Sequence, residues 1–352
     1  MNQSLLYIIF NRIFAAYLRH LGWNARQMDS FDTGFISTDD HTNGDILDET
    51  YDNVSIYLKG DGDFIPIVTG FLARGKHSGA ITTLGRGGSD LSATVIGKAL
   101  GLQEVQVWKD VDGVLTTDPR IVPEAQTVSR LTFEEATELA YFGATVLHPQ
   151  SMLPAMQTEA GPHSLKVRVM NSYRQEFSGT VISHPEDSVT EGTVTAESVS
   201  STHDEPRLTS IVLKRNVTML EIVSTRMLGQ YGFLKRVFQV FDDNKISVDL
   251  VTTSEVSVCV TLDPLKIWTR QLQQQELDKL VGGFQDFASV RLTDKLAIIS
   301  LIGDMSSSSA LLGRAFDSLN SNGINVKLIS KVQLVVWKVE AFDFRFFYSH
   351  LF

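Results

Sequence analysis

The sequence predicts an α/β protein, in which a sandwich of helices around a mainly parallel sheet is followed by two smaller α+β modules. From residue 11 to about 182, short apolar runs alternate with helical patterns, as in parallel sheets covered by helices. A segment rich in Ser, Thr, Glu and Pro comes next, and beyond it the sequence repeats itself at an offset of 78 residues. We therefore expect a sandwich over residues 1–182, a linker over 183–207, and modules over 208–290 and 291–352.

Local signals predict the elements of the first part. The helical pattern that starts at Asp90 stops at Gly101, and Thr132 with Glu135 forms a capping box for a helix to about Phe142. Apolar runs at residues 65–68, 105–108 and 165–170 predict strands, the first of them buried. One buried helix face is expected from the spacing of Ile13, Phe14, Tyr17, Leu18 and Leu21.

The repeat predicts two copies of one small module. Residues 227–238 match residues 305–316, and the apolar strand at 246–251 matches 324–329 in the same register. Each copy reads as strand, helix and strand, so one α+β unit is expected to occur twice.

Composition argues against several classes of function. With a formal charge of −10, the chain lacks the basic face that nucleic acid requires, although a nucleotide needs only a few local positive groups. The eight His have no metal-ligand spacing, so no metal held by the protein is expected. The apolar run at residues 5–10 is too short to cross a membrane, and the single cysteine, Cys259, fits a buried strand position and a reducing compartment.

The most informative motif is the glycine turn, which we define as residues 85–90 with the sequence GRGGSD. Glycines before a helix let the backbone approach a ligand and leave N–H groups that point at it. Arg86 adds a guanidinium that grips a carboxylate or phosphate with two hydrogen bonds. The turn predicts a site for small anions and suggests a kinase. The alternatives are a surface ion pair for Arg86 and a helix-start charge for Asp90.

A second motif, WKDVDGVLTTDPR, occupies residues 108–120. It follows a predicted strand and so lies at the carboxyl edge of the sheet, where open α/β folds bind ligands. Lys109 and Arg120 suit phosphates, and the acidic residues suit a hydrated Mg²⁺. The alternative is a polar turn, since Asp-Gly is a common turn pair.

These motifs, together with LTFEEATELAYFGATVLHPQSM at residues 131–152, resemble the amino acid kinase family and, within it, the aspartate kinases, most closely the monofunctional plant type. The resemblance extends from about residue 11 to 331. The repeat resembles the tandem ACT modules that follow this catalytic domain, which implies an amino acid kinase-like αβα sandwich. Acetylglutamate, glutamate and uridylate kinases share the sandwich without an ACT pair, so a different carboxylate kinase is disfavoured.

The resemblance implies phosphoryl transfer from MgATP to the side-chain carboxylate of L-aspartate, giving 4-phospho-L-aspartate, the first step of lysine, threonine and methionine biosynthesis. ATP is then a substrate, and no tightly bound cofactor is implied. By resemblance, Arg86 binds an aspartate carboxylate with Ser89 nearby, and Asp90 organises the cationic group that meets the transferred phosphoryl. The implied nucleotide contacts are Lys109, Asp110, Leu115, Arg120, Thr145 and Val146, with Thr145 standing where many bacterial relatives have Lys.

The resemblance to lysine-inhibited aspartate kinases also implies an effector site where a turn meets a helix N-terminus, with L-lysine as effector and S-adenosylmethionine as a second candidate. Its candidates are Met227, Gln230, Gly232, Phe233, Leu234, Ser247, Val248, Asp249, Thr253, Ser254 and Glu255. Asp249 and Glu255 suit an ammonium group, whereas part of Phe233 and Leu234 is expected to be core. ACT pairing implies a homodimer. The plant-like similarity implies a chloroplast location, with the cytoplasm as the alternative because no transit segment is visible.

Two features expected from the family are absent from the sequence. The family opens with a strand carrying Lys-Phe-Gly-Gly and later carries a Gly-Glu pair, whereas this chain begins MNQSLLYIIF and joins the pattern at Asn11. We therefore expect an incomplete sandwich and a chain that is inactive or nearly so. An effector-binding or dimerising protein is the alternative to a feedback-inhibited aspartate kinase. Residues 332–339 are expected to form a strand. The Phe-rich remainder resembles no module helix, so a translated intron or alternative gene end is favoured over a membrane- or partner-binding tail.

Overall fold

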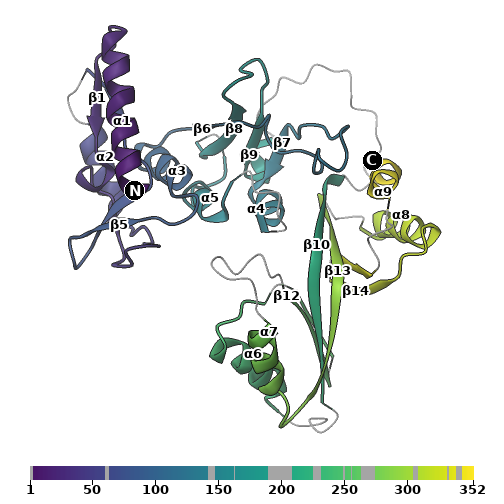
Figure 1. Cartoon of the computed structure of the whole chain (residues 1–352). Coiled ribbons are helices and arrows are strands. Elements are labelled where there is room, and N and C mark those ends of the chain that lie inside the picture. The colour runs from purple at the N-terminus through teal and green to yellow at the C-terminus, as the bar shows by residue number, and fades with distance from the viewer. Residues whose placement is uncertain are drawn as a thin grey trace. The chain divides into compact units, whose positions relative to one another are not determined.

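The computed structural model describes residues 3–59, 63–141, 147–161, 163–188, 208–224, 231–248, 250–254, 256–262, 274–303, 308–330, 333–337 and 343–352. The chain divides into two compact units (Figure 1). The first comprises Met1–Thr116 and Gln126–Ser200, and the second comprises Thr117–Ala125 and Ser201–Phe352. The predicted mixed α/β class is confirmed. No helix in the described ranges is both long and apolar enough to cross a membrane.

The first unit contains three small sheets among its described residues. Its elements are α1 (Gln3–His20), β1 (Ala25–Met28), η1 (Ser30–Asp32), β2 (Ile36–Ser37), α2 (Glu49–Leu58), β3 (Ile65–Val68), β4 (Leu72–Gly75), β5 (Ile81–Thr83), α3 (Gly88–Leu100), β6 (Glu104–Lys109), β7 (Arg130–Thr132), α4 (Phe133–Tyr141), α5 (Pro149–Met156), β8 (Lys166–Asn171), β9 (Thr180–Ser183) and η2 (Pro185–Ser188). The sheets have the orders β1-β3, β2-β4-β5 and β6-β8-β9-β7. Strand pairs β1–β3 and β6–β8 are parallel, and α3 packs against α2, α5 and β6.

Several local predictions are confirmed. Helix α3 stops at Gly101, whose φ of +68° is left-handed, and the predicted strands correspond to β3, β6 and β8. The capping box also forms, because the Thr132 N–H donates to Glu135 Oε2 at 2.8 Å and the Glu135 N–H donates to Thr132 Oγ1 at 3.1 Å. These features depend on residues close together in the chain.

Two burial predictions are wrong. Ile65 and Pro66 of β3 are exposed, because β3 pairs with β1 alone among the described strands. The expected buried face of α1 is also largely exposed, since Ile13, Phe14, Tyr17 and Leu21 are each more than half accessible. Helix α1 packs on this narrow two-stranded sheet, which is too small to cover so wide an apolar face.

The second unit is built on one antiparallel sheet with the order β11-β12-β10-β13-β15-β14. Its elements are β10 (Leu208–Val223), α6 (Phe233–Asp243), β11 (Val251–Thr253), β12 (Ser257–Leu262), α7 (Gln274–Gly282), β13 (Ser289–Gly303), α8 (Ser308–Ser321), β14 (Val326–Ser330), β15 (Gln333–Trp337) and α9 (Phe344–Leu351). Helix α6 and strand β11 of the first module correspond to α8 and β14 of the second.

The two modules share their longest strands. Leu220 and Ile222 of β10 belong to one apolar core with α6 and α7, whereas Ile211 of the same strand belongs to another core with α8 and α9. Between the part of β10 that belongs to one core and the part that belongs to the other, the β10–β13 register shifts. In the same region Asn216 (φ 61°) and Lys295 (φ 58°) adopt left-handed backbone conformations. These irregularities bend the ribbon so that each strand serves both cores.

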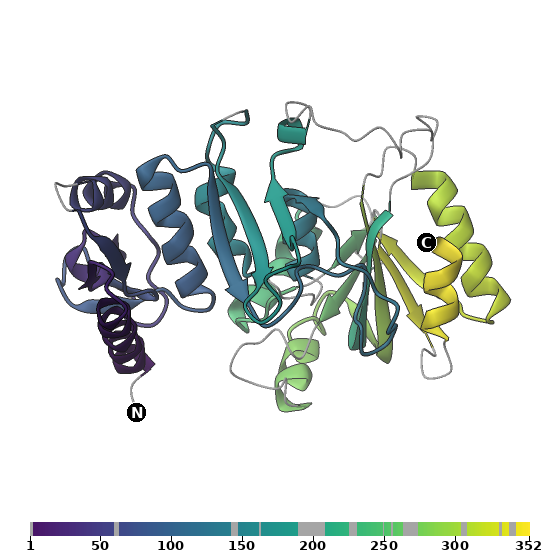
Figure 2. The ribbon, with the colours of Figure 1, turned by 90° about the horizontal axis from the view of Figure 1, so that it is seen from above.

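The Phe-rich C-terminal segment was expected to match no module helix, but it forms α9. Phe344, Phe347 and Leu351 are buried in the core of the second module, and α9 lies beside α8 on one face of the sheet (Figure 2). The Asp343 carboxylate caps the helix by accepting hydrogen bonds from the N–H groups of Arg345 and Phe346 at 3.1 and 3.2 Å. The expected strand before it corresponds to β15.

Truncating Phe347 tests this placement of α9. Phe347→Ala is expected to lower the free energy of unfolding by about 3–5 kcal/mol, because a fully buried ring leaves a cavity. Phe346 on the same helix is 49% exposed and provides the matched control, since Phe346→Ala should cost less than about 1 kcal/mol. Denaturant unfolding of both variants measures the difference. Equal losses of stability would contradict a core position for Phe347.

Candidate active site

The glycine turn is held in a shape that requires glycine. It follows β5, because the hairpin β4–β5 intervenes between β3 and α3. Gly85 and Gly87 have φ values of +67° and +74°, and a Cβ on Gly87 would lie 2.5 Å from His148 Cβ. The Leu91 N–H donates to Gly87 O at 2.9 Å, which starts α3 directly after the turn. Any larger residue at position 87 would therefore displace the start of the helix from α5.

The structure brings together one charged residue from each of the two motifs. Asp90 lies in the first turn of α3, and Lys109 is the last residue of β6. Lys109 Nζ donates to Asp90 Oδ2 at 2.9 Å, with the two side chains 27% and 19% exposed. A partly buried ammonium beside a carboxylate is fixed in position and retains donors for an anionic ligand.

His148 joins this group, although sequence reasoning did not select it. It precedes α5 and packs against Gly87. Burial and the positive charge of Arg86 lower the pKa of His148, whereas the nearby Asp90 carboxylate raises it. Arg86 itself is exposed. The sequence signal was available, since His148 lies inside the third motif and directly before Pro149.

Ser89 lies in the first turn of α3 and has a buried hydroxyl. Its Oγ is buried and has no hydrogen-bond partner among the described residues. Ser89 lines a cavity of about 500 Å³ together with Thr69 and Gly70, which follow β3. A Cβ on Gly70 would lie 3.2 Å from Ser89 Cα, so the two loops are in close contact.

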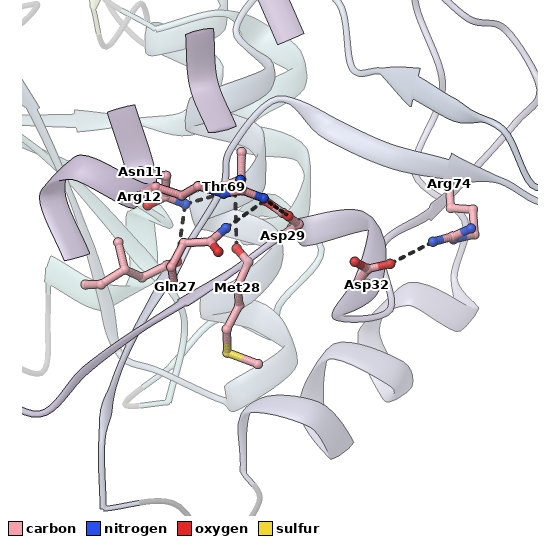
Figure 3. A network of polar contacts seen from close by, with 9 residues as sticks. Asn11, Arg12, Gln27, Met28, Asp29, Asp32, Thr69 and Arg74 are labelled. Atoms are coloured by element: carbon pink, nitrogen blue, oxygen red, sulfur yellow. Dashed lines mark hydrogen bonds and ion pairs between the residues drawn. The ribbon is translucent and has the colours of Figure 1, made fainter. Parts of the chain in front are cut away.

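A polar network joins the middle of α1 to the ends of β1 and β3 (Figure 3). Asn11 Nδ2 donates to Thr69 Oγ1 at 2.9 Å and to Ile67 O at 3.2 Å. Thr69 Oγ1 in turn donates to Asp29 Oδ1 at 2.9 Å, and Gln27 Nε2 donates to the same oxygen at 2.7 Å. The network therefore positions the loop that contacts Ser89.

The loop after β6 is anchored through Asp112. Asp112 accepts a hydrogen bond from Asn171 Nδ2 at 2.6 Å and forms an ion pair with Arg174, whereas Asp110 is exposed. Leu115 forms an isolated bridge with Thr127. Among the described residues, no group of three or more His, Cys, Asp or Glu side chains could hold a metal ion.

Arg120 belongs to the second unit and not to the unit that holds Lys109. Its guanidinium pairs with Asp118 at 2.7 Å, and the hydrogen bond from Arg120 lowers the pKa of Asp118. Two other predicted nucleotide contacts, Thr145 and Val146, lie outside the described residues.

The described effector candidates lie at the start of α6, in the segment after α6 and at the end of β11. Gly232 has a left-handed φ of +88° and precedes Phe233, which is buried in the core, whereas Leu234 is exposed. Ser247 is exposed and Val248 half-buried, and Thr253 and Ser254 are exposed at the end of β11. Met227, Gln230, Asp249 and Glu255 lie outside the described residues.

Charge removal around His148 tests the geometry of the site. Arg86→Gln is expected to raise the pKa of His148 toward its ordinary value, and Asp90→Asn is expected to lower it further, because the two charges act in opposite directions. NMR titration of the imidazole signals measures both shifts. Arg26→Gln, which removes a charge that does not perturb His148, is the control. Shifts of the same sign in Arg86→Gln and Asp90→Asn would contradict the arrangement.

Comparison with family models identifies both parts of the chain. Residues 4–171 match the amino acid kinase family, so the match begins before Asn11, and residues 220–266 match an ACT domain. The chain is 56% identical over 323 residues to "Aspartokinase 1, chloroplastic" of Arabidopsis thaliana, covering 91% of this chain and 53% of that protein. It is 36% identical over 248 residues to "Lysine-sensitive aspartokinase 3" of Escherichia coli, covering 70% of this chain and 50% of that protein. The chain spans about half the length of these relatives.

Solved structures agree with this assignment. E. coli aspartokinase III in complex with lysine and aspartate matches with a TM-score of 0.73 and 29% identity, over 97% of this chain and 73% of that one. The same enzyme in complex with aspartate and ADP matches with a TM-score of 0.72, 29% identity and the same coverage. The chain matches an amino acid kinase domain followed by an ACT domain, and it is similar in sequence to named aspartokinases. We conclude that the chain belongs to the aspartokinase family.

Proposed function

We propose that the chain is an aspartate kinase that binds L-aspartate and MgATP around the glycine turn and Lys109. The observation that carries the proposal is the ion pair of 2.9 Å between Lys109 and Asp90 beside that turn. The relation to an enzyme solved in complex with aspartate and ADP supports the same substrates.

The proposed reaction moves the γ-phosphoryl group of ATP to a side-chain oxygen of aspartate. The bond from the γ-phosphorus to the β–γ bridging oxygen breaks as the new P–O bond forms, and ADP leaves with the electron pair. The attacking carboxylate is already an anion, so no base is needed, and the site must instead bring anions together and neutralise charge. Lys109 provides a positive charge at the phosphoryl group, held in place by Asp90.

The remaining site residues have separate proposed roles. Arg86, exposed on the glycine turn, binds a carboxylate of the substrate through two hydrogen bonds. The buried Ser89 hydroxyl, without a partner in the described residues, hydrogen-bonds the same substrate. The proposed nucleotide contacts are Lys109, Asp110, Leu115, Arg120, Thr145 and Val146.

Removing the ammonium of Lys109 tests the catalytic proposal. Lys109→Met is expected to lower kcat/KM for ATP by about 10²–10³-fold, because the transition state loses a preorganised positive charge. Lys98 of α3, whose Nζ donates to Gln157 away from the glycine turn, provides the control Lys98→Met, which should retain activity. An assay of ADP release with aspartate and MgATP measures both variants. Lack of turnover by the parent chain would instead support the non-catalytic alternative.

We further propose that L-lysine binds the first ACT module. The left-handed turn at Gly232 leaves the first N–H groups of α6 available for the effector carboxylate. At the repeat offset of 78 residues, Asp249 of the first module corresponds to Lys327 of the second. An effector ammonium is attracted to the first position and repelled from the second, so one lysine site per chain is expected.

A thermal shift assay tests the lysine site. Excess L-lysine is expected to raise the melting temperature, and Asp249→Ala should abolish the shift, because the ammonium loses its counter-charge. Lys327→Ala alters the corresponding position of the second module and should preserve the shift. A melting temperature that lysine leaves unchanged in the parent chain would remove lysine as the effector.

The organisation of the whole protein follows as part of the same proposal. The sandwich would occupy residues 1–182, the linker 183–207, and the modules 208–290 and 291–352. We propose a homodimer formed through the ACT modules, with S-adenosylmethionine as a second effector to test. Relatives named as chloroplastic support a chloroplast location.

A further inference from the structure

The first unit has a cavity of about 600 Å³ that no part of the proposed function uses. It is lined by Arg12 and Arg19 of α1, by Asn24 and residues 25–27 at β1, and by Phe64 before β3. None of these residues lines the cavity that contains Ser89. We call this site the arginine pocket. The side-by-side arrangement of α1 and β1 that forms it is visible in Figure 1.

The arginine pocket is positively charged, whereas the chain as a whole has a negative formal charge. Three guanidinium groups line it and no Asp or Glu does, in a chain with a formal charge of −10. Arg12 and Arg19 are seven residues apart and so lie on the same helix face. Arg26 approaches the cavity from the neighbouring strand. Three like charges in one concave site attract an anion more strongly than any one of them alone.

The guanidinium groups are held in place, and among the described residues Arg12 alone of the three has a carboxylate partner. Arg19 donates through Nη1 to Ala25 O at 3.0 Å, and the Arg26 guanidinium lies 5.3 Å from the centre of the Phe64 ring. Within the described part of the chain, the carboxylate that contacts the trio is Asp29, 3.8 Å from Arg12. Asp29 already accepts hydrogen bonds from Gln27 and Thr69 (Figure 3). Most guanidinium donors therefore remain for a ligand.

We propose that the arginine pocket binds a small anion that carries two or more phosphate groups. Guanidinium forks match phosphate oxygens with paired hydrogen bonds, and three of them on two elements can contact neighbouring phosphates at once. The volume fits a small metabolite and exceeds the need of a single phosphate. The C-terminus of α1 contributes only about half a negative charge, which the three full positive charges outweigh. Because two arginines are already anchored, binding orders little additional structure.

Calorimetry with inorganic triphosphate, without Mg²⁺ and at low ionic strength, tests the proposal on the full chain. The double variant Arg19→Gln/Arg26→Gln is expected to bind triphosphate about tenfold or more weakly than the parent, because two of the three charges are lost. The control Arg215→Gln/Lys235→Gln removes the same total charge from exposed positions of the second unit and should bind like the parent. Added salt should weaken parent binding.

Two further measurements separate this pocket from the candidate active site. With saturating MgADP present to occupy the candidate active site, the parent should still bind triphosphate, and Arg19→Gln/Arg26→Gln should retain MgADP binding. The single variant Arg26→Gln removes a side chain whose described contact is the Phe64 ring. It guards against misfolding of the double variant and should also weaken triphosphate binding. Equal affinity of the double variant and its charge-matched control, or no binding by the parent, would overturn the proposal without affecting the kinase assignment.

Discussion

The close approach of Gly87 to His148 is the constraint on which the candidate site depends. A Cβ at position 87 would lie 2.5 Å from His148, so the turn, α3 and α5 meet only because glycine is present. At the other end of α3, a Cβ on Gly97 would lie 2.4 Å from Val105 of β6. Two glycines therefore let α3 pack closely against both neighbours. This packing sets the distance at which Asp90 reaches Lys109.

The second unit depends on a different constraint, the sharing of β10 and β13 between two cores. A change in the core around Phe233 acts on the same strand that supplies Ile211 to the core around Phe347. Val122, which follows the Lys109 motif in the chain, is 2% exposed in that second core. The covalent path from Lys109 to Val122 is short. Strand β10 therefore links the core around α6 to the core that holds Val122.

Features set by neighbouring residues could be predicted from the sequence. The end of α3, the capping box of α4 and the strand β6 follow from local patterns. The exposure of β3 and α1 could not be predicted, because burial depends on which distant strands pair. His148 was missed for the same reason, since its contact with Gly87 joins distant parts of the chain. Helix α9 was predictable, because Phe344, Phe347 and Leu351 have the spacing of one helix face.

The repeat indicates which of the two modules suits the proposed effector. The two modules share one topology, yet they differ where charge matters, with Asp249 in the first and Lys327 in the second. The second module differs also in its core, which takes in Ile121 and Val122 from the Thr117–Ala125 segment. The hydrogen bond from Arg345 to Ile121 O anchors this segment. The two copies thus differ in both charge and packing: the first has the charge that suits the proposed effector, and the second holds the segment that follows residue 116 in the chain.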